Sequence, residues 1–153
     1  MQKQMISNSS LSNADSLQIV SFSLGKEEFA INIKNIQEII KVQPITMVPL
    51  TKPFVAGVMS LRGNIIPVIN LRLRMGFSDN EITINTRIIV VNQENRKVGL
   101  IVDNMNQVLG IPVEQVTPPP PESFDSENYA FIEAICILGE RLITLLDINN
   151  LLN

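Results

Sequence analysis

The sequence predicts a mainly β fold, built from two similar barrel-like lobes packed face to face. Apolar residues make up 45% of the 153 positions, but there is no tryptophan and there are only one tyrosine and six phenylalanines. Branched aliphatic side chains must therefore fill the core, and these favour strands. An internal repeat indicates two lobes, because seven pairs of residues share one offset of 69 positions. The pairs are Phe29/Val98, Ile33/Val102, Ile36/Met105, Ile39/Val108, Ile40/Leu109, Met47/Val116 and Pro49/Pro118.

A hairpin is predicted at the start of the patterned region. Apolar residues alternate with serines over residues 20–24, and the alternation resumes over residues 29–33 after a turn at Gly25. The spacing then becomes helical, and we expect one or two turns of helix with Asn35 as a cap. Helical spacing is shown by Ile36, Ile39 and Ile40, and again by Met105, Val108 and Leu109. Short extended pieces at 45–48 and 113–116 follow the two segments.

The central hairpin is the most specific local pattern. An apolar strand at 57–61 meets a tight turn at Arg62, and the return strand leads to a short helix opened by Asn70. Pro67 must lie at a sheet edge or a bulge, because proline cannot donate to a β ladder. A similar hairpin is predicted over residues 135–148, which strengthens the repeat.

The rest of the chain adds strands and connections. The four prolines at 118–121 favour a stiff spacer over a recognition motif, because no flanking basic residue completes an SH3-type ligand. We expect a polar loop at 77–85, strands at 88–91, 98–102, 130–138 and 142–146, and a final helical piece capped by Asp147.

Composition argues against several classes of function. The net charge is −3 and the charges are scattered, which is unfavourable for nucleic acid or an anionic membrane. The chain has no histidine, the commonest general base and metal ligand, and its serines and threonines have no evident catalytic partner. Its single cysteine, Cys136, is expected to be buried, and Asp103 is expected to be a cap or a surface acid. We therefore predict no catalysis, no cofactor and no metal site.

The domain organisation follows from these patterns. Residues 1–16 are polar and unlike a signal peptide, so we expect a disordered tail, and no apolar run approaches the length of a membrane span. The chain is predicted to be cytoplasmic. Residues 17–153 form the folded unit, with a first lobe at about 29–85 and a second lobe from 17–28 plus 86–153.

Four motifs together resemble one known family. They are the run Gly57–Arg72, the pattern Ile33-x-x-Ile36-x-Glu38-Ile39, the segment Val98–Asp103 and the terminal Leu145–Ile148. In this order and spacing they resemble CheW-type adaptors, which couple chemoreceptors to the histidine kinase CheA. The resemblance covers residues 17–152 and implies two five-stranded, SH3-like barrel lobes. It also implies a non-catalytic scaffold whose partners are the cytoplasmic receptor tip and the CheA regulatory domain, with ring assembly with CheA or with itself.

Two positions depart from the pattern of the family. Ser60 stands where asparagine is more usual, and Asn70 stands where aspartate is more usual. Asparagine caps a helix about as well as aspartate, but it carries no charge. If that charge normally pairs with a basic group, Arg72 or Arg74 is expected to be freer in this chain.

Arg62 is the residue that the resemblance singles out. We hypothesise that its guanidinium grips the Glu38 carboxylate beside the lobe junction and organises a partner-binding surface. If the pair is partly buried, breaking it should cost about 3–5 kcal/mol. The alternative is a solvated arginine at a hairpin tip, worth less than about 1 kcal/mol.

The resemblance also suggests an apolar groove between the lobes that receives the receptor tip. The ordinary interpretation of apolar residues at helical spacing is core packing, and both interpretations stay open. Gly57 and Gly99 allow either a close backbone approach or a bulge or turn. The predicted groove residues and organisers are Ile36, Glu38, Val42, Gly57, Val58, Arg62, Met105 and Val108.

Other functions compete with the chemotaxis adaptor. A CheW-like scaffold of a motility or second-messenger array is not separable from it by sequence. A small β-barrel that binds nucleic acid is a further alternative, against which the acidic charge and the few aromatic residues count.

Overall fold

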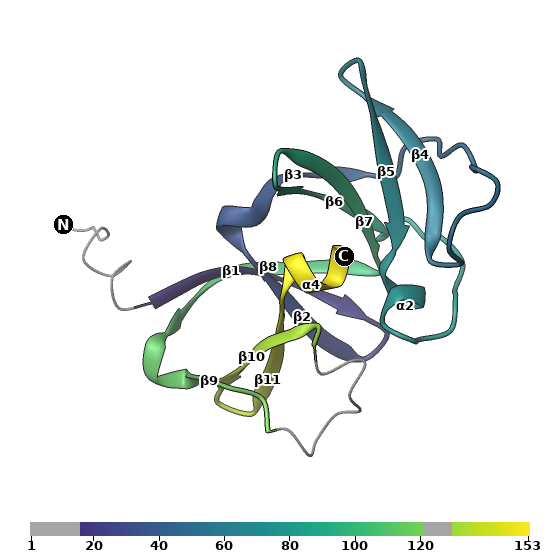
Figure 1. The fold of residues 1–153 in the computed structure, drawn as a ribbon. Helices are drawn as coiled ribbons and strands as arrows, with labels where there is room; N and C mark the ends of the chain where they lie inside the picture. The colour runs from purple at the N-terminus through teal and green to yellow at the C-terminus, as the bar shows by residue number, and fades with distance from the viewer. Residues whose placement is uncertain (1–15, 121–129) are drawn as a thin grey trace.

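The computed structural model describes residues 16–120 and 130–153, which form two sheets and several short helices (Figure 1). Lobe 1 is a five-stranded sheet, ordered β3 (Ile36–Lys41), β6 (Arg87–Gln93), β7 (Arg96–Val102), β5 (Asn64–Asn70) and β4 (Val55–Leu61). Lobe 2 is a six-stranded sheet, ordered β8 (Asn104–Pro112), β1 (Ser16–Leu24), β2 (Glu27–Asn32), β11 (Arg141–Leu146), β10 (Ile132–Leu138) and β9 (Val116–Thr117). The short helices are η2 (Ile33–Asn35), α2 (Leu71–Arg74), η3 (Val113–Gln115) and α4 (Ile148–Leu152).

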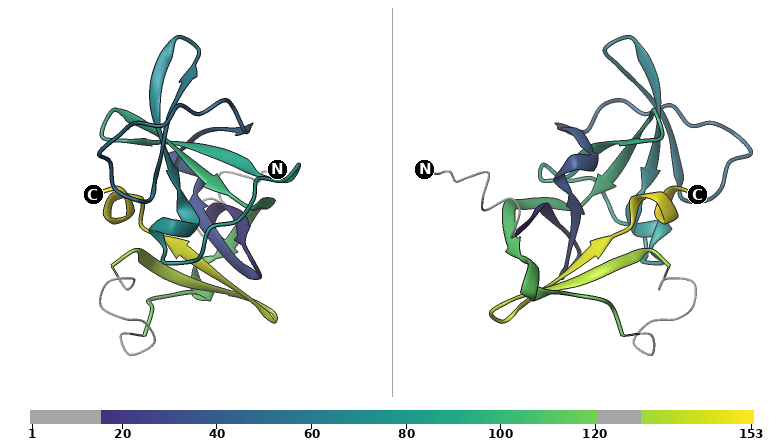
Figure 2. Two further views of the ribbon diagram at one scale, coloured as in Figure 1. Left: turned by 90° about the vertical axis from the view of Figure 1, so that its right-hand side faces the viewer. Right: turned by 60° about the vertical axis from the view of Figure 1, so that its left-hand side comes forward.

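The predicted repeat is present in the topology. In lobe 2 the hairpin β1–β2 pairs in parallel with β11 of the hairpin β10–β11, and α4 follows. In lobe 1 the hairpin β6–β7 pairs in parallel with β5 of the hairpin β4–β5, and α2 follows. The prediction of a mainly β protein with two similar lobes is therefore correct. The β4–β5 and β10–β11 hairpins lie at opposite ends of the molecule (Figures 1 and 2).

The lobes exchange one strand each. β3 follows β2 in sequence but pairs with β6 in lobe 1, and β8 follows β7 but pairs with β1 in lobe 2. The sheets consequently divide the chain differently from the expected lobes, which were about 29–85 for the first and 17–28 plus 86–153 for the second. β2 belongs to lobe 2, whereas β6 and β7 belong to lobe 1. Local patterns cannot show this exchange, because each crossing strand would fit either sheet.

The two segments with helical spacing are strands, so this prediction was wrong. Within β3, Ile36, Glu38 and Ile40 are half-buried while the residues between them are exposed, as in a strand. A bulge lies at Gln37, since Ile36 pairs with Val91 and Glu38 pairs with Val90. β8 has the equivalent bulge at Asn106, 69 positions later. Ile39 and Val108, which completed the helical spacing, lie instead on the exposed side of their strands. The short helix occupies Ile33–Asn35.

Three apolar cores hold the lobes. Each lobe has a small core of its own, and a larger core lies between the lobes. This shared core takes side chains from both sheets and both α-helices. It includes Phe22, Phe29, Ile69, Leu71, Ile89, Leu100, Phe131, Leu146, Ile148 and Leu151.

The local predictions for the hairpins and for two of the caps are confirmed, whereas the predicted cap at Asn35 was wrong, because Asn32 caps η2 and Asn35 ends it. The turn between β4 and β5 has positive φ at Arg62 (51°) and Gly63 (84°), as a tight two-residue hairpin requires. Asn70 and Asp147 cap α2 and α4. Pro67 lies one residue before β5 begins its register with β7, so its missing N–H costs no ladder bond there.

The structure describes the expected tail and the proline spacer only in part. Residues 1–15 and Pro121 lie outside the described residues, so the tail and the full proline run are not described. Ser16, which was assigned to the tail, is the first residue of β1.

Candidate functional site

The hypothesised ion pair between Arg62 and Glu38 is present. Arg62 projects from the β4–β5 turn and Glu38 from the edge strand β3, and the guanidinium contacts both carboxylate oxygens at 3.0 and 3.3 Å. The Arg62 side chain is 68% exposed and that of Glu38 is 24% exposed. Solvent screening therefore limits the pair to less than about 1 kcal/mol, and the larger value expected for a buried pair does not apply.

Gly57 satisfies both interpretations that its sequence context left open. It lies at a β4 bulge, where the register with β5 shifts between Val55 and Gly57, and its φ of +146° is unfavourable for other residues. A Cβ at this position would also collide with the main-chain oxygen of Thr46. Thr46 in turn exchanges main-chain hydrogen bonds of 2.8 and 2.9 Å with Val58. The glycine thus lets the preceding loop reach the outer edge of β4.

Ile36 and Met105 both pack against the shared core between the lobes. Ile36 is the first residue of β3, Met105 is the second residue of β8, and both are half-buried. Val108 lies further along β8, opposite Val20, and is 61% exposed. Val42 lies just beyond β3, beside a hollow of about 500 Å³ that Ile84 and Arg87 also line. The structure therefore joins Glu38 with Arg62, places Ile36 and Met105 against the same core, and places Val42 apart, just beyond the end of β3.

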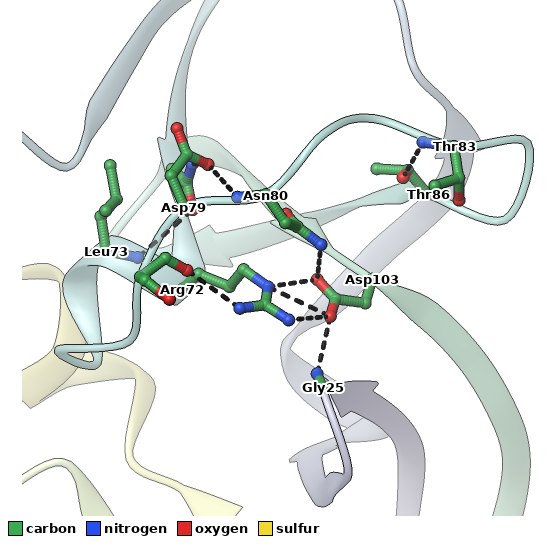
Figure 3. Close-up of polar contacts among 10 residues, drawn as sticks. Gly25, Arg72, Leu73, Asp79, Asn80, Thr83, Thr86 and Asp103 are labelled. Atoms are coloured by element: carbon green, nitrogen blue, oxygen red, sulfur yellow. Dashed lines mark hydrogen bonds and ion pairs between the residues drawn. The ribbon is translucent and has the colours of Figure 1, made fainter.

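The strongest polar cluster of the described residues was missed by the sequence reasoning. Arg72 on α2 makes a bidentate contact with Asp103, with Nε and Nη2 at 2.7–3.1 Å from the carboxylate oxygens (Figure 3). The same carboxylate accepts bonds from the Gly25 main chain at 2.6 Å and from the Asn80 amide. Arg72 also donates to the main-chain oxygen of Ser78. Both partners lay within family motifs, but nothing in the sequence linked two positions 31 residues apart.

The electrostatic environment of Asp103 favours its charged form. Burial by itself raises the pKa of this carboxyl, but the hydrogen bonds from Arg72 and Gly25 outweigh burial and lower the pKa below its ordinary value. The expectation that Asp103 is a mere cap or surface acid was wrong. Arg72 and Arg74 are not freer either, because Arg74 donates a 2.7 Å bond to the main-chain oxygen of Leu151.

Asn70 keeps the capping role of the more usual aspartate. Its side-chain oxygen accepts the Leu73 N–H at 3.3 Å, and its amide nitrogen donates to Asp79 at 2.9 Å. The bond to Asp79 explains why this position holds asparagine, because an amide can donate to a neighbouring carboxylate whereas an aspartate at position 70 would repel it.

Groups suited to catalysis or metal binding do not gather in the described part of the chain. No group of three metal-ligating side chains is found among the residues described. Cys136 is fully buried in the lobe 2 core, as expected, and burial raises the pKa of its thiol, which makes it unreactive.

A family model for the CheW-like domain matches residues 18–153, nearly the whole chain. The chain belongs to the CheW-like family. The CheW chemotaxis protein of Helicobacter pylori is 35% identical over 140 residues, covering 92% of this chain and 84% of that protein. The CheW protein of Klebsiella aerogenes is 37% identical over 132 residues, covering 86% and 79% of the two chains.

A solved CheW structure confirms the fold. The scaffolding protein TtCheW from Thermoanaerobacter tengcongensis superposes with a TM-score of 0.80 and is 36% identical, with 86% of this chain and 89% of that chain covered. The CheW-like domain described here thus has the two SH3-like lobes expected from the resemblance. Among the described residues, no helix is long and apolar enough to cross a membrane.

Proposed function

We propose that this CheW-like protein is a non-catalytic adaptor that couples chemoreceptors to the histidine kinase CheA, in receptor arrays beneath the inner membrane. The observation that carries the proposal is the exposed Arg62–Glu38 pair between the β4–β5 turn and the edge strand β3, in a chain that matches the CheW-like family over residues 18–153. The pair adds little stability, so its role is better sought in recognition. An adaptor needs only surfaces that hold two partners in one geometry, and a change in that geometry then shifts the activity of the kinase.

The receptor tip is proposed to bind at the lobe junction. Ile36 and Met105 supply half-buried apolar contacts from the two crossing strands, and Arg62 with Glu38 forms a charged rim. An apolar groove with a polar rim suits a helical partner. The proposed surface is completed by Gly57, which positions β4, and by Val58 and Val108 on β4 and β8. Val42 lies apart from this surface, just beyond the end of β3.

The ends of the lobes are proposed to bind the CheA regulatory domain, with rings formed by alternation with CheA or by self-assembly. Large apolar side chains are exposed in the loops of lobe 1, where Met47 and Ile84 are more than four-fifths exposed and Leu50 is fully exposed. Leu50 also has a positive φ of 62°, which is strained for leucine. Val113 and Leu142 are exposed on lobe 2. Exposed apolar groups of this kind are typical of protein interaction sites.

Calorimetric titration tests both contacts separately. One titration uses the isolated CheA regulatory domain of the same organism, and the other uses a fragment of the cytoplasmic tip of a chemoreceptor. We expect saturable binding to each partner, with the receptor affinity lowered in Arg62→Ala and Ile36→Glu. Arg96→Ala is the matched control, because Arg96 is an exposed lobe 1 arginine that donates to Gln93.

The outcomes distinguish the alternatives. Loss of receptor binding in the two variants but not in the control, with folding intact, supports the proposed groove. Binding to neither partner at high micromolar concentration contradicts the chemotaxis role and favours a scaffold of another array. Binding to single-stranded DNA that weakens with salt would favour the nucleic-acid alternative.

A further inference from the structure

The two repeats meet at equivalent phenylalanines. Phe54 lies immediately before the β4–β5 hairpin, and Phe131, 77 positions later, lies immediately before the β10–β11 hairpin. The main-chain oxygen of each accepts a 2.8 Å bond from the residue that ends its own hairpin, Asn70 in lobe 1 and Asp147 in lobe 2. Each phenylalanine is thus fixed to the base of one hairpin, where the two strands and the following helix meet.

Arg74 lies between these two rings. Its guanidinium carbon is 4.6 Å from the centre of the Phe54 ring and 4.5 Å from the centre of the Phe131 ring, within cation–π range of both. The same group donates bonds of 2.7 and 3.2 Å to the main-chain oxygens of Leu151 and Asn153. One side chain on α2 of lobe 1 therefore holds the hairpin base of its own lobe, the hairpin base of lobe 2 and the end of α4.

This contact breaks the symmetry of the repeat. The position equivalent to Arg74, 77 residues later, is Leu151, which is fully buried in the shared core. Lobe 2 therefore has no arginine of its own at this place, and a single guanidinium serves both lobes. A planar guanidinium can stack on rings and donate along its edges at the same time, which a lysine ammonium cannot do.

We propose that Arg74 is a positioning residue that couples the two hairpins, so that a displacement of the Arg62 hairpin is transmitted to the β10–β11 hairpin. The shared core keeps the lobes together, whereas Arg74 connects the hairpin bases directly. A shift of Phe54 displaces the guanidinium, which moves Phe131 and, through its hydrogen bonds, the end of α4 with it. In an adaptor, this link makes the surface on one lobe sensitive to what is bound on the other. The link itself does not depend on the identity of the partners.

Amide hydrogen exchange on the whole protein tests the coupling without a partner. We expect Arg74→Met to accelerate exchange about tenfold at the bases of both hairpins, including the Asp147 and Leu151 amides of lobe 2. Arg74→Lys should retain part of the protection, because an ammonium keeps the charge but not the fork. Arg96→Met removes an arginine that donates to Gln93 and should leave both regions unchanged. Acceleration confined to lobe 1 would overturn the proposal.

A second measurement separates coupling from stability. Amide chemical shifts are compared for Arg62→Ala in the native and in the Arg74→Met backgrounds, below the unfolding midpoint of each. We expect the Arg62 substitution to perturb β10–β11 amides only when Arg74 is present. Equal perturbation in both backgrounds, or no perturbation in either, would contradict the coupling. If Arg74→Met does not fold, the same comparison is made in Arg74→Lys, where a reduced perturbation is expected. Failure of receptor or kinase binding would leave both results unaffected.

Discussion

Arg72 and Asp103 form the least exposed of the three ion pairs in the described residues, with Nη2 and Oδ2 2.7 Å apart and the side chains 16% and 19% exposed. Asp103 is the single residue between β7 of lobe 1 and β8 of lobe 2. Its carboxylate binds α2 of lobe 1 through Arg72 and the β1–β2 turn of lobe 2 through the Gly25 N–H. The pair therefore fixes the chain where a strand passes from one lobe to the other.

Breaking this pair should be costly. Arg72→Met leaves a largely buried carboxylate without its cation, so we expect the free energy of unfolding to fall by about 3 kcal/mol in urea titrations. Arg141→Met is the matched control, because Arg141 pairs with Glu28 at 2.6 Å but is 41% exposed, and it should cost less than about 1 kcal/mol. A double variant that also carries Asp103→Leu should lose less than the sum of the single variants. Equal losses of unfolding free energy in Arg72→Met and Arg141→Met would show that the Arg72–Asp103 pair stabilises the fold no more than the exposed Arg141–Glu28 pair does.

The free energy of unfolding should decrease as the pH falls from 7 towards 3. The carboxyl pKa values of Asp103 and Glu28 are lower than their ordinary values of 3.8 and 4.5, because hydrogen bonds from arginines outweigh the opposing effect of burial. These groups bind fewer protons when folded, so their contribution is complete above the unfolded pKa and is lost as the pH falls below about 5. Thermal unfolding between pH 7 and pH 3 measures this slope. It should be shallower in Asp103→Asn, and an unchanged slope would exclude Asp103 as a contributor.

Gly57→Ala should disrupt the outer edge of β4. The methyl group would collide with the Thr46 oxygen at a φ that alanine avoids, so we expect a loss of about 2 kcal/mol or more in unfolding free energy. Gly110→Ala is the control, since its nearest neighbour is the end of the flexible Gln18 side chain and its φ is not positive. Greater damage from Gly110→Ala than from Gly57→Ala would contradict the close approach of Thr46.

Restoring the more usual aspartate should not stabilise this chain. Asn70→Asp would place a second carboxylate against Asp79, where the amide now donates a 2.9 Å bond, so we expect a loss of about 1 kcal/mol at neutral pH. The double variant Asn70→Asp with Asp79→Asn should recover most of the loss, because the donor and the acceptor are exchanged. Chemical denaturation of the three variants checks both statements, and a gain in stability for Asn70→Asp alone would refute them.

Much of this protein was determined by its sequence alone. The four hairpins are encoded by alternation with turn residues between the strands, and the caps at Asn70 and Asp147 are encoded by residue type at a helix start. These features depend on neighbours within a few positions, so local chemistry is sufficient. The repeat and the contact between Arg62 and Glu38 were also predictable, the first from a constant offset and the second from the resemblance to CheW-type adaptors.

The tertiary structure decided the rest. The segments after Ile36 and Met105 are strands, because a neighbouring sheet provides their hydrogen-bond partners. The exchange of β3 and β8 depends on which sheet edge each strand meets, and no short-range pattern carries that information. The contacts of Arg72 with Asp103 and of Arg74 with Phe131 join positions 31 and 57 residues apart. The pairing of β5 with β7 within lobe 1 brings Arg72 to Asp103, whereas the packing of one lobe against the other brings Arg74 to Phe131.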